Sequence, residues 1–582
     1  MTDTSTILLV DLSAGSWRAE EVDTAGALGF GGKVLGIHLL ERYLDARIDP
    51  LASDNVVVIT PSPLAAYSMS GSNRFGAFTK SPLTGIWLEA YCGGTFARTL
   101  TETGWGAVVI VGAAAAPIHL NITAEGARFL PADDFWGKDT FAVEAELLAR
   151  LDTRSSVLCI GVAGENLVKV ASVMHEHAHT LGRGGMGAVF GSKKLKAVSA
   201  TSPGALRSEA QEQFVQTRRE VSKLATESPA SDIYRRQGTA MMTALVNEAR
   251  AFPTDFFTSG VAPHRDTLEA EHWPEWATLD NHTCPPCQLR CRKRLTLTEG
   301  PEAGRQMHGP EYETIYAFGG SCMVEHARDV AKLNERCNML GMDTISSGNL
   351  AAVAIRARQT GRLPDGPAAG DVEGISRLLD EIATRATPMG STLAEGMDDA
   401  LATFGVSEWS ITSKRLDPAG YDPRKLKGMA LSYALSVRGA CHLRATFYKP
   451  ELMGLLDGMD DDTYVQTYID WEDRMVLLDG LTMCRFYRDF MSWDRILSAA
   501  GQLNGAPVTK EQLERLSTET ITRIRRLNLA TGLSPASDTV AERFLLEPSD
   551  AAPALDREEL RRRVSIYWAK RGWTEEGLPP AD

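Results

Sequence analysis

The chain has 582 residues, 43% of them hydrophobic and 23% charged, and its 61 Lys and Arg against 75 Asp and Glu give a formal net charge of −14 at pH 7. That length predicts two to four domains, and the composition is that of an ordinary soluble globular protein. The acidic balance argues against general nucleic-acid binding, which needs a basic face to displace counterions. A local basic site that binds a small anion is compatible with this net negative charge.

The N-terminus predicts a strand rather than a targeting segment. Leu8, Val10 and Leu12 alternate with other residues before a turn at 14–15, and this alternation is typical of a strand. No basic region precedes a long apolar core, as a secretory signal requires. The most apolar stretch, residues 107–118, is too short to cross a bilayer. We therefore expect a cytoplasmic protein without a membrane span.

The sequence changes character near residue 206. Strand-like runs bounded by Gly, Pro or Ser dominate before that point, and apolar positions at three- and four-residue spacing follow it, as in 209–227 and 327–342. The sequence therefore predicts an α+β fold. We expect a β-rich N-terminal domain over residues 1–205 and two mainly α-helical domains over 206–412 and 413–582.

Glycine-rich segments in the first domain carry basic residues. Arg74 lies in one such segment, Gly93 begins a Gly-Gly pair, and Arg183 lies in a third segment that extends to residue 191. Glycine lets a backbone approach a ligand closely, its N–H groups can surround a phosphate, and arginine adds charge-assisted contacts. The segments match neither a dinucleotide fingerprint nor a Walker loop. Tight turns in a crowded sheet are the alternative explanation.

Three cysteines lie close together in the second domain. Cys284, Cys287 and Cys291 fall within eight residues, so one loop can surround a metal centre. A [4Fe–4S] cluster needs a fourth thiolate from elsewhere. Zinc also accepts four sulfur ligands, but no second close pair follows and the next cysteine is Cys322. The spacing favours an iron–sulfur cluster and leaves zinc open.

Several segments together resemble the tungsten-dependent aldehyde:ferredoxin oxidoreductase family. The resemblance covers about residues 5–545 and holds in order as well as in content. Its most specific parts are the three-cysteine loop and the segments RFGAFTKSPLTG (74–85), AGEN (163–166), GRGGMGAVFGSKKLK (182–196), GPEYET (309–314), DPR (422–424) and YALSVRGACH (433–442).

The resemblance implies a set of cofactors. In that family tungsten is held by the dithiolenes of two pterins, without a ligand from the protein. A Mg²⁺ ion bridges the pterin phosphates, and one [4Fe–4S] cluster lies beside a pterin. The family's D-x-x-G-L-C element corresponds to residues 479–484 here, so Cys484 would be the fourth cluster ligand. Because the pterins supply the sulfur ligands of the metal, molybdenum remains an alternative to tungsten.

The resemblance also nominates residues that contact the pterins. Arg74, Gly93 and Arg183 would lie near the phosphates and ring systems, and the first domain would be the bis-pterin-binding domain. Two matched elements add four further contacts, namely Asn338, Met342, Asp479 and Met483. The chain departs from the family pattern at several of these positions. Asn338 stands where the family has Asp, Thr482 where it has Gly, and Met342 and Met483 where it has Leu.

Glu313 and His442 are the catalytic candidates that the resemblance implies. Glu313 would activate water or accept a proton, and His442 would hydrogen-bond the carbonyl oxygen and share the protons. Without the resemblance, the simpler interpretations are a carboxylate at a helix start and a histidine with a structural role.

The implied reaction interconverts aldehydes and carboxylic acids. Electrons would pass through the cluster to ferredoxin or to an iron–sulfur partner subunit, in a homodimer or a hetero-oligomer. One alternative is a catalytic subunit of the benzoyl-CoA reductase type, which uses the same cofactors. Another is a non-catalytic interaction subunit stabilised by zinc, which predicts zinc and no pterin.

Overall fold

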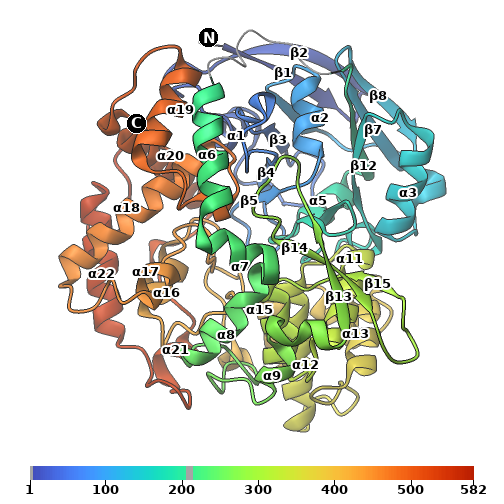
Figure 1. The fold of residues 1–582 in the computed structure, drawn as a ribbon, viewed down its shortest axis with the longest axis vertical. Helices are drawn as coiled ribbons and strands as arrows, with labels where there is room; N and C mark the ends of the chain where they lie inside the picture. Colours follow the sequence, from blue (N-terminus) through green and yellow to red (C-terminus); the bar gives the residue numbers. More distant parts are fainter. Residues whose placement is uncertain (1–3, 205–213, 582) are drawn as a thin grey trace.

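The computed structural model describes residues 4–204 and 214–581. Two six-stranded sheets form its N-terminal part (Figure 1). The first sheet has the strand order β2 (Ser16–Asp23), β1 (Thr4–Asp11), β6 (Ala107–Val111), β3 (Val57–Pro61), β4 (Phe75–Lys80) and β5 (Trp87–Cys92). Only the β1–β6 pair is parallel in this sheet.

The second sheet has the order β11 (His179–Leu181), β10 (Val173–His175), β9 (Ser155–Ile160), β12 (Leu195–Thr201), β7 (Ile118–Thr123) and β8 (Gly126–Pro131). Both sheets contribute to one apolar core, which includes Leu8 and Val10 from β1 and Leu120 from β7. The neighbouring residues Ile7 and Leu9 pack on the other side of β1, against α1 (Gly32–Tyr43). The predicted N-terminal strand is therefore confirmed, and it is buried on both faces.

Short helices accompany these sheets, namely α2 (Phe96–Glu102), α3 (Thr140–Arg150), α4 (Val162–Glu165) and α5 (Met186–Ser192). The middle of the chain begins with α6 (Val215–Glu227), α7 (Pro229–Gln237), α8 (Met241–Glu248) and α9 (Arg265–Leu268). A three-stranded antiparallel sheet follows, made of β13 (Ala277–His282), β14 (Arg292–Leu297) and β15 (Gln306–His308).

Helices make up most of the remaining chain, and the α+β fold class is confirmed. The middle region continues with α10 (Tyr312–Thr314), a π-helix (Ile315–Ser321), α11 (Ala327–Leu340), α12 (Thr344–Gln359), α13 (Val372–Thr384), α14 (Pro388–Leu393) and α15 (Met397–Phe404). The C-terminal region holds α16 (Lys427–Leu435), α17 (Tyr448–Leu452), α18 (Asp461–Gly480), α19 (Trp493–Asn504), α20 (Lys510–Ala530), α21 (Glu542–Leu546) and α22 (Arg557–Lys570).

The boundary predicted at 205/206 lies outside the described residues, and the boundary at 412/413 stays a prediction. In Figure 1 the blue and teal sheets lie at the upper right, the yellow-green helices below them, and the orange and red C-terminal helices on the left. Among the described residues, no helix combines the length and the apolar character needed to cross a membrane.

Helix α1 joins the first sheet to the C-terminal helices. It packs on β3 and β4 and also against α18 and α20. A Cβ added at Gly32 would come within 2.0 Å of the Asp479 carbonyl oxygen and 2.6 Å of Thr482 Oγ1. Glycine at this point therefore lets the turn after α18 lie directly on the start of α1. That contact brings residues 479–484 into the N-terminal half of the molecule.

Candidate active site

A cavity of about 340 Å³ lies where the N-terminal sheets, the β13–β14 hairpin and the C-terminal helices meet. Of the thirteen site residues predicted from the sequence, all but Gly93 line it. They are Arg74, Arg183, Cys284, Cys287, Cys291, Glu313, Asn338, Met342, His442, Asp479, Met483 and Cys484. These residues come from segments that are far apart in the sequence, so the fold itself brings them together.

The four predicted metal-binding cysteines converge from two segments. Cys284, Cys287 and Cys291 lie in the loop that joins β13 to β14, and the register of that hairpin pairs His282 with Arg292. Cys484 follows α18, and its N–H donates to the Gly71 carbonyl oxygen over 2.7 Å. All four cysteines are free thiols.

The electrostatics of the thiols fit a metal centre. Burial raises the pKa of all four thiols, most strongly at Cys291, and the thiols raise one another's pKa further. The Arg74 guanidinium opposes this effect at Cys284 and Cys484. Metals bind the thiolate form, so a metal bound here would stabilise these thiols as anions.

Gly93 lies behind the cysteine loop rather than on the cavity wall. A Cβ added there would be 3.0 Å from Cys284 Sγ and 3.2 Å from both Cε1 and Nδ1 of His179. The neighbouring Gly94 has a φ of 93°, and its added Cβ would be 2.5 Å from His175 Nε2. The Gly-Gly pair therefore allows the backbone after β5 to pack directly against the thiol loop and the β10–β11 hairpin.

A buried network of charges forms another wall of the cavity. Lys33 Nζ lies 3.1 Å from Glu89 Oε2 and 3.1 Å from Asp479 Oδ2. Arg444 Nη1 lies 2.8 Å from the same two oxygens, and Arg485 Nη2 lies 2.5 Å from Asp479 Oδ1. Three cations thus surround two carboxylates, which leaves a net positive charge suited to an anionic ligand.

Asp479 is the centre of this network. Burial alone would raise the pKa of Asp479, but the Arg444, Arg485 and Lys33 cations outweigh burial and hold it below its usual range. Both of its carboxylate oxygens are engaged by cations. In this structure Asp479 therefore orients basic side chains at the cavity wall. Its predicted contact with a pterin stays a prediction.

Asn338 and Met483 lie at the ends of two helices. Asn338 is in the last turn of α11, which ends in a left-handed residue, Gly341, with a φ of 73°. Met483 follows α18, where Thr482 adopts the left-handed region with a φ of 51°. A glycine would adopt that conformation without the cost that a β-branched residue incurs, of order 1–3 kcal/mol. The departure Thr482 noted in the sequence is therefore a strained position beside the cavity.

The two catalytic candidates lie opposite each other. His442 Nε2 is 3.4 Å from Glu313 Oε1, and the Gly420 N–H donates to Glu313 Oε2 over 2.8 Å. Neither Glu313 Oε1 nor His442 Nδ1 has a hydrogen-bond partner among the described residues. Two buried polar atoms without partners at the wall of a cavity indicate a ligand that would satisfy them.

Burial sets the protonation of this pair. It raises the pKa of Glu313 to about 8. Burial also lowers the pKa of His442 well below its ordinary range, and the nearby Arg183, Arg438 and Arg444 lower it further. At neutral pH Glu313 is therefore a neutral acid that can donate a proton, and His442 is a neutral base that can accept one.

Arg183 is held at the same wall by two carboxylates. Its Nη2 lies 3.2 Å from Asp417 Oδ2, its Nε lies 3.4 Å from Asp343 Oδ2, and its Nη1 donates to the Ala440 carbonyl oxygen over 3.0 Å. Arg74 instead donates to the Tyr91 carbonyl oxygen over 3.0 Å. The two arginines are thus fixed by different partners at the cavity.

The sequence did not single out the charged residues Lys33, Glu89, Arg438, Arg444 and Arg485, although all five are buried at the cavity or directly behind it. The sequence contains one signal of such buried charges. Glu89 is a lone acid between Leu88 and Ala90 in a strand-like run, and a charge inside an apolar strand requires a buried partner.

Comparison with known proteins identifies the family. The model of the N-terminal domain of aldehyde ferredoxin oxidoreductase matches residues 7–202, and the model of its domains 2 and 3 matches residues 216–582. The chain belongs to the aldehyde ferredoxin oxidoreductase family. It is therefore an oxidoreductase of this type, and the resemblance drawn from its motifs is confirmed.

Relatives of this family member match over nearly its whole length. It is 32% identical to the tungsten-containing aldehyde ferredoxin oxidoreductase of Pyrococcus furiosus, over 98% of this chain and 96% of the relative. It is also 32% identical to the enzyme of that name from Thermococcus kodakarensis, over 99% and 97%. Among solved structures, the fold is shared by the active-site complex BamBC of benzoyl coenzyme A reductase with 1,5-dienoyl-CoA. The TM-score is 0.81 and the sequence identity is 18%, and the match covers 99% of this chain and 95% of that chain.

Proposed function

We propose that this oxidoreductase is a tungsten–pterin enzyme that interconverts aldehydes and carboxylic acids. In this proposal electrons leave through a single [4Fe–4S] cluster to ferredoxin or to an iron–sulfur partner subunit. The observation that carries it is the convergence of four free thiols and the Glu313–His442 pair on one cavity. The near full-length relatives that carry the words tungsten and aldehyde in their names support it.

The residues of the cavity suit the proposed cofactors. Cys284, Cys287, Cys291 and Cys484 would hold the cluster, since their thiols converge and are not joined to one another. Lys33 and Arg444 would help to hold anionic pterin groups through the positive charge of the network around Asp479. The Mg²⁺ bridge between phosphates rests on the family resemblance alone.

The reaction is the conversion of an aldehyde and water to an acid, with the release of two electrons and two protons. When bound, a tungsten–pterin centre supplies the capacity to take up the two electrons. The side chains then have two tasks, to polarise the carbonyl group and to handle protons. The arrangement of Glu313 and His442 fits both tasks.

Glu313 is proposed to donate a hydrogen bond to the carbonyl oxygen of the aldehyde. Its raised pKa, about 8, keeps the proton on the carboxyl group at neutral pH, and the Gly420 N–H fixes the other oxygen of the group. His442, neutral at this pH, would accept the proton that water loses as it adds to the carbonyl carbon. The sequence suggested the opposite division of roles, with Glu313 as the base.

The assay that tests this proposal measures substrate-dependent electron transfer under anaerobic conditions. Purified holoenzyme is given either a panel of aliphatic and aromatic aldehydes or benzoyl-CoA with a low-potential donor. The proposal predicts aldehyde-dependent reduction of ferredoxin or of a viologen dye, and no reduction of benzoyl-CoA. Reduction of benzoyl-CoA without aldehyde oxidation would replace the proposal with the alternative of the benzoyl-CoA reductase type. The zinc-stabilised non-catalytic subunit is no longer in competition, because the chain is an enzyme of this family.

A further inference from the structure

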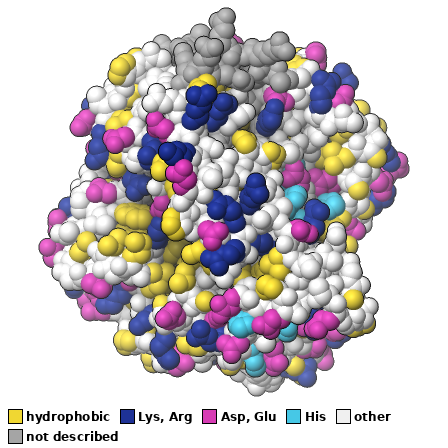
Figure 2. All heavy atoms as spheres, in the orientation of Figure 1, with side chains coloured by type: hydrophobic (Ala, Val, Ile, Leu, Met, Phe, Trp, Pro, Cys, Tyr) yellow, Lys and Arg dark blue, Asp and Glu magenta, His cyan; other side chains and the backbone are white. Residues whose placement is uncertain are grey.

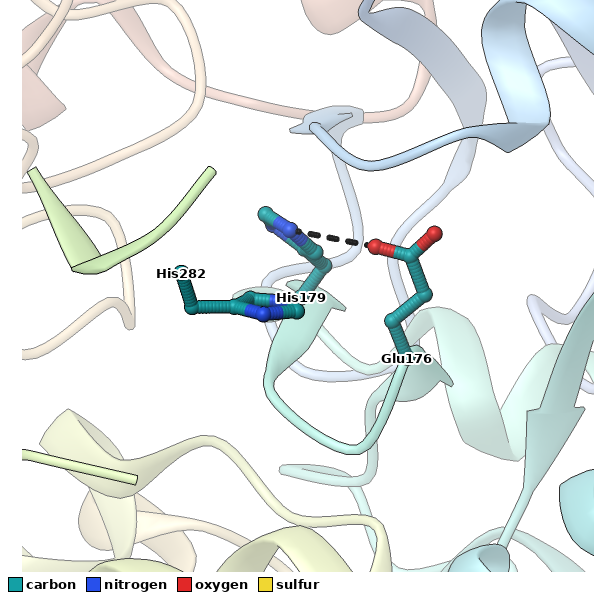
Figure 3. Close-up of side chains that lie close together, drawn as sticks. All are labelled: Glu176, His179 and His282. Atoms are coloured by element: carbon teal, nitrogen blue, oxygen red, sulfur yellow. Dashed lines mark ion pairs between the residues drawn. The ribbon is translucent and has the colours of Figure 1, made fainter. Parts of the chain in front are cut away.

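A cluster of metal-ligating side chains lies beside the cysteine loop. Glu176, His179 and His282 each offer one ligand atom, and these three atoms lie within 4.8 Å of one another. Figure 3 shows the three side chains lying close together, with a dashed line that marks the ion pair between His179 and Glu176. Glu176 and His179 belong to the β10–β11 hairpin, and His282 ends β13.

The β10–β11 turn is built to present Glu176. Both Glu176 and His177 have positive φ values, 48° and 60°, a conformation that costs energy for residues other than glycine. The buried carboxylate of Glu144 holds this turn, because it accepts from the Glu176 N–H over 2.8 Å and from the His177 N–H over 3.1 Å. Thr95 fixes one oxygen of the Glu176 carboxylate by donating its N–H to Oε1 over 3.1 Å and its hydroxyl over 2.6 Å.

One of the three ligand atoms has no partner within the described part of the chain, and the contact between the other two is long. His282 Nε2 is buried without a hydrogen-bond partner among the described residues. The second Glu176 oxygen, Oε2, lies 3.5 Å from His179 Nε2, longer than a good charge-assisted hydrogen bond. Gly94 leaves room for this carboxylate, since an added Cβ there would lie 2.9 Å from Glu176 Oε2. His282 Nε2, buried without a partner in the described residues beside a carboxylate fixed at its other oxygen, indicates a ligand from outside the chain.

We propose that Glu176, His179 and His282 bind a divalent transition-metal ion, at a site separate from the four-cysteine centre. Two imidazoles and one carboxylate form a ligand set that suits Zn²⁺ or Fe²⁺ and leaves a further coordination position. His179 and His282 also line the main cavity, so that position is open to water or to a small ligand. On the face shown in Figure 2, a small group of histidine side chains reaches the surface on the right.

The surroundings offset the charge of such an ion. Arg292 pairs with His282 across the β13–β14 hairpin and places nearby a positive charge that opposes a cation at this site. The Glu176 carboxylate and the buried Glu144 supply the negative charge that offsets a cation at this site. The sulfur of Cys284 lies 3.7 Å from His179 Nε2, so the thiolates of a bound cluster would add negative charge. An ion at this site would therefore lie next to the proposed cluster and, as a fixed positive charge, would raise its reduction potential.

Zn²⁺ binding to the cluster-loaded enzyme tests the proposal, since a filled cysteine centre prevents Zn²⁺ from binding to free thiols. The protein is dialysed anaerobically against a mild chelator and titrated with Zn²⁺ in competition with a chromophoric chelator. We expect the wild type to bind about one Zn²⁺ per chain. Loss of a residue that supports a ligand typically weakens metal affinity by about 10- to 100-fold. Glu176→Gln and His282→Gln each remove a ligand itself, so each should weaken Zn²⁺ affinity by more than about 100-fold.

His308→Gln is the matched control. Its ring lies 5.5 Å from that of His282, and its Nδ1 is also buried without a partner in the described chain, but it is not one of the three ligands. This variant should bind Zn²⁺ as the wild type does. Equal binding by all variants, or no binding by the wild type, would overturn the proposal.

A measurement on the wild type alone keeps the proposal testable if the variants fail to fold. Anomalous scattering at the zinc edge, from crystals of the Zn²⁺-loaded enzyme, should give a peak among Glu176, His179 and His282. A peak elsewhere, or none, would contradict the site. The site does not depend on the proposed reaction, because a missing aldehyde activity would leave both measurements unchanged.

Discussion

Replacing Glu313 with glutamine removes a titrating group and keeps the shape of the side chain. Burial raises the pKa of Glu313 to about 8 from an ordinary value of 4.5. Below pH 4.5 both the folded and the unfolded chain carry this proton. As the pH rises from 4.5 to about 8, the unfolded chain loses the proton and the folded chain keeps it, so the free energy of unfolding decreases over this window.

The size of the effect follows from that window. At pH 7 the unfolded carboxyl group is 2.5 pH units above its pKa of 4.5, and each unit corresponds to about 1.36 kcal/mol. Glu313 therefore lowers the free energy of unfolding by about 3 kcal/mol at pH 7. With an entropy of unfolding of about 2.1 cal/mol/K per residue over 582 residues, removing this cost should raise Tm by about 3 °C.

Thermal unfolding of the wild type and Glu313→Gln, at matched metal content, measures this difference. We expect the variant to be more stable by about 3 °C at pH 7, with the gap nearly closed at pH 4.5 and aldehyde oxidation lost. Glu408→Gln, at an exposed carboxylate, is the control and should follow the wild type at both pH values. A variant that is less stable than the wild type at pH 7, or a gap that does not change with pH, would refute the proton assignment.

Three other substitutions test the cavity and the packing behind it. Cys484→Ser should lower the iron content and impair electron transfer to an acceptor. The control Cys337→Ala, at a buried cysteine outside the cavity, should do neither. Unchanged iron content and normal electron transfer in Cys484→Ser would remove Cys484 from its proposed role as a cluster ligand. Gly93→Ala places a Cβ 3.0 Å from Cys284 Sγ and should also lower iron content. Gly501→Ala, whose added Cβ comes no nearer than 3.5 Å to its neighbours, should leave it unchanged. Asp479→Asn leaves three buried cations with one carboxylate fewer, so the free energy of unfolding should fall by about 3–5 kcal/mol, which is measured as a lower Tm. An unchanged Tm would contradict the proposed charge network.

Part of the site was visible in the sequence and part was not. The three-cysteine loop is local, so spacing alone predicted a metal centre there. Cys484 lies far along the chain from Cys291, and only the resemblance to a family connected it with the loop. The physical reason for its position is the close contact between the turn after α18 and Gly32, where backbone atoms approach to distances that exclude a Cβ. Spacing along the sequence carries no information about such a contact.

Protonation states also needed the structure. Glu313 and His442 were predicted as a pair, but their roles depend on burial and on Arg183, Arg438 and Arg444 around His442. The group of Glu176, His179 and His282 was missed because its residues come from two segments of the chain. Each of the two histidines, taken alone, is indistinguishable from an ordinary structural histidine. Its one local signal was the Glu-x-x-His spacing of Glu176 and His179.

Elemental analysis tests the central claim most directly. Protein purified without oxygen, from cells able to make the pterin cofactor, is analysed for tungsten, molybdenum, iron, zinc and phosphorus. The proposed cofactors predict about one tungsten, about four iron atoms in one cluster and about two phosphates per chain. Zinc found beside this set is assigned to the site of Glu176, His179 and His282. Zinc in the four-cysteine centre, without tungsten or phosphorus, would contradict the tungsten–pterin function.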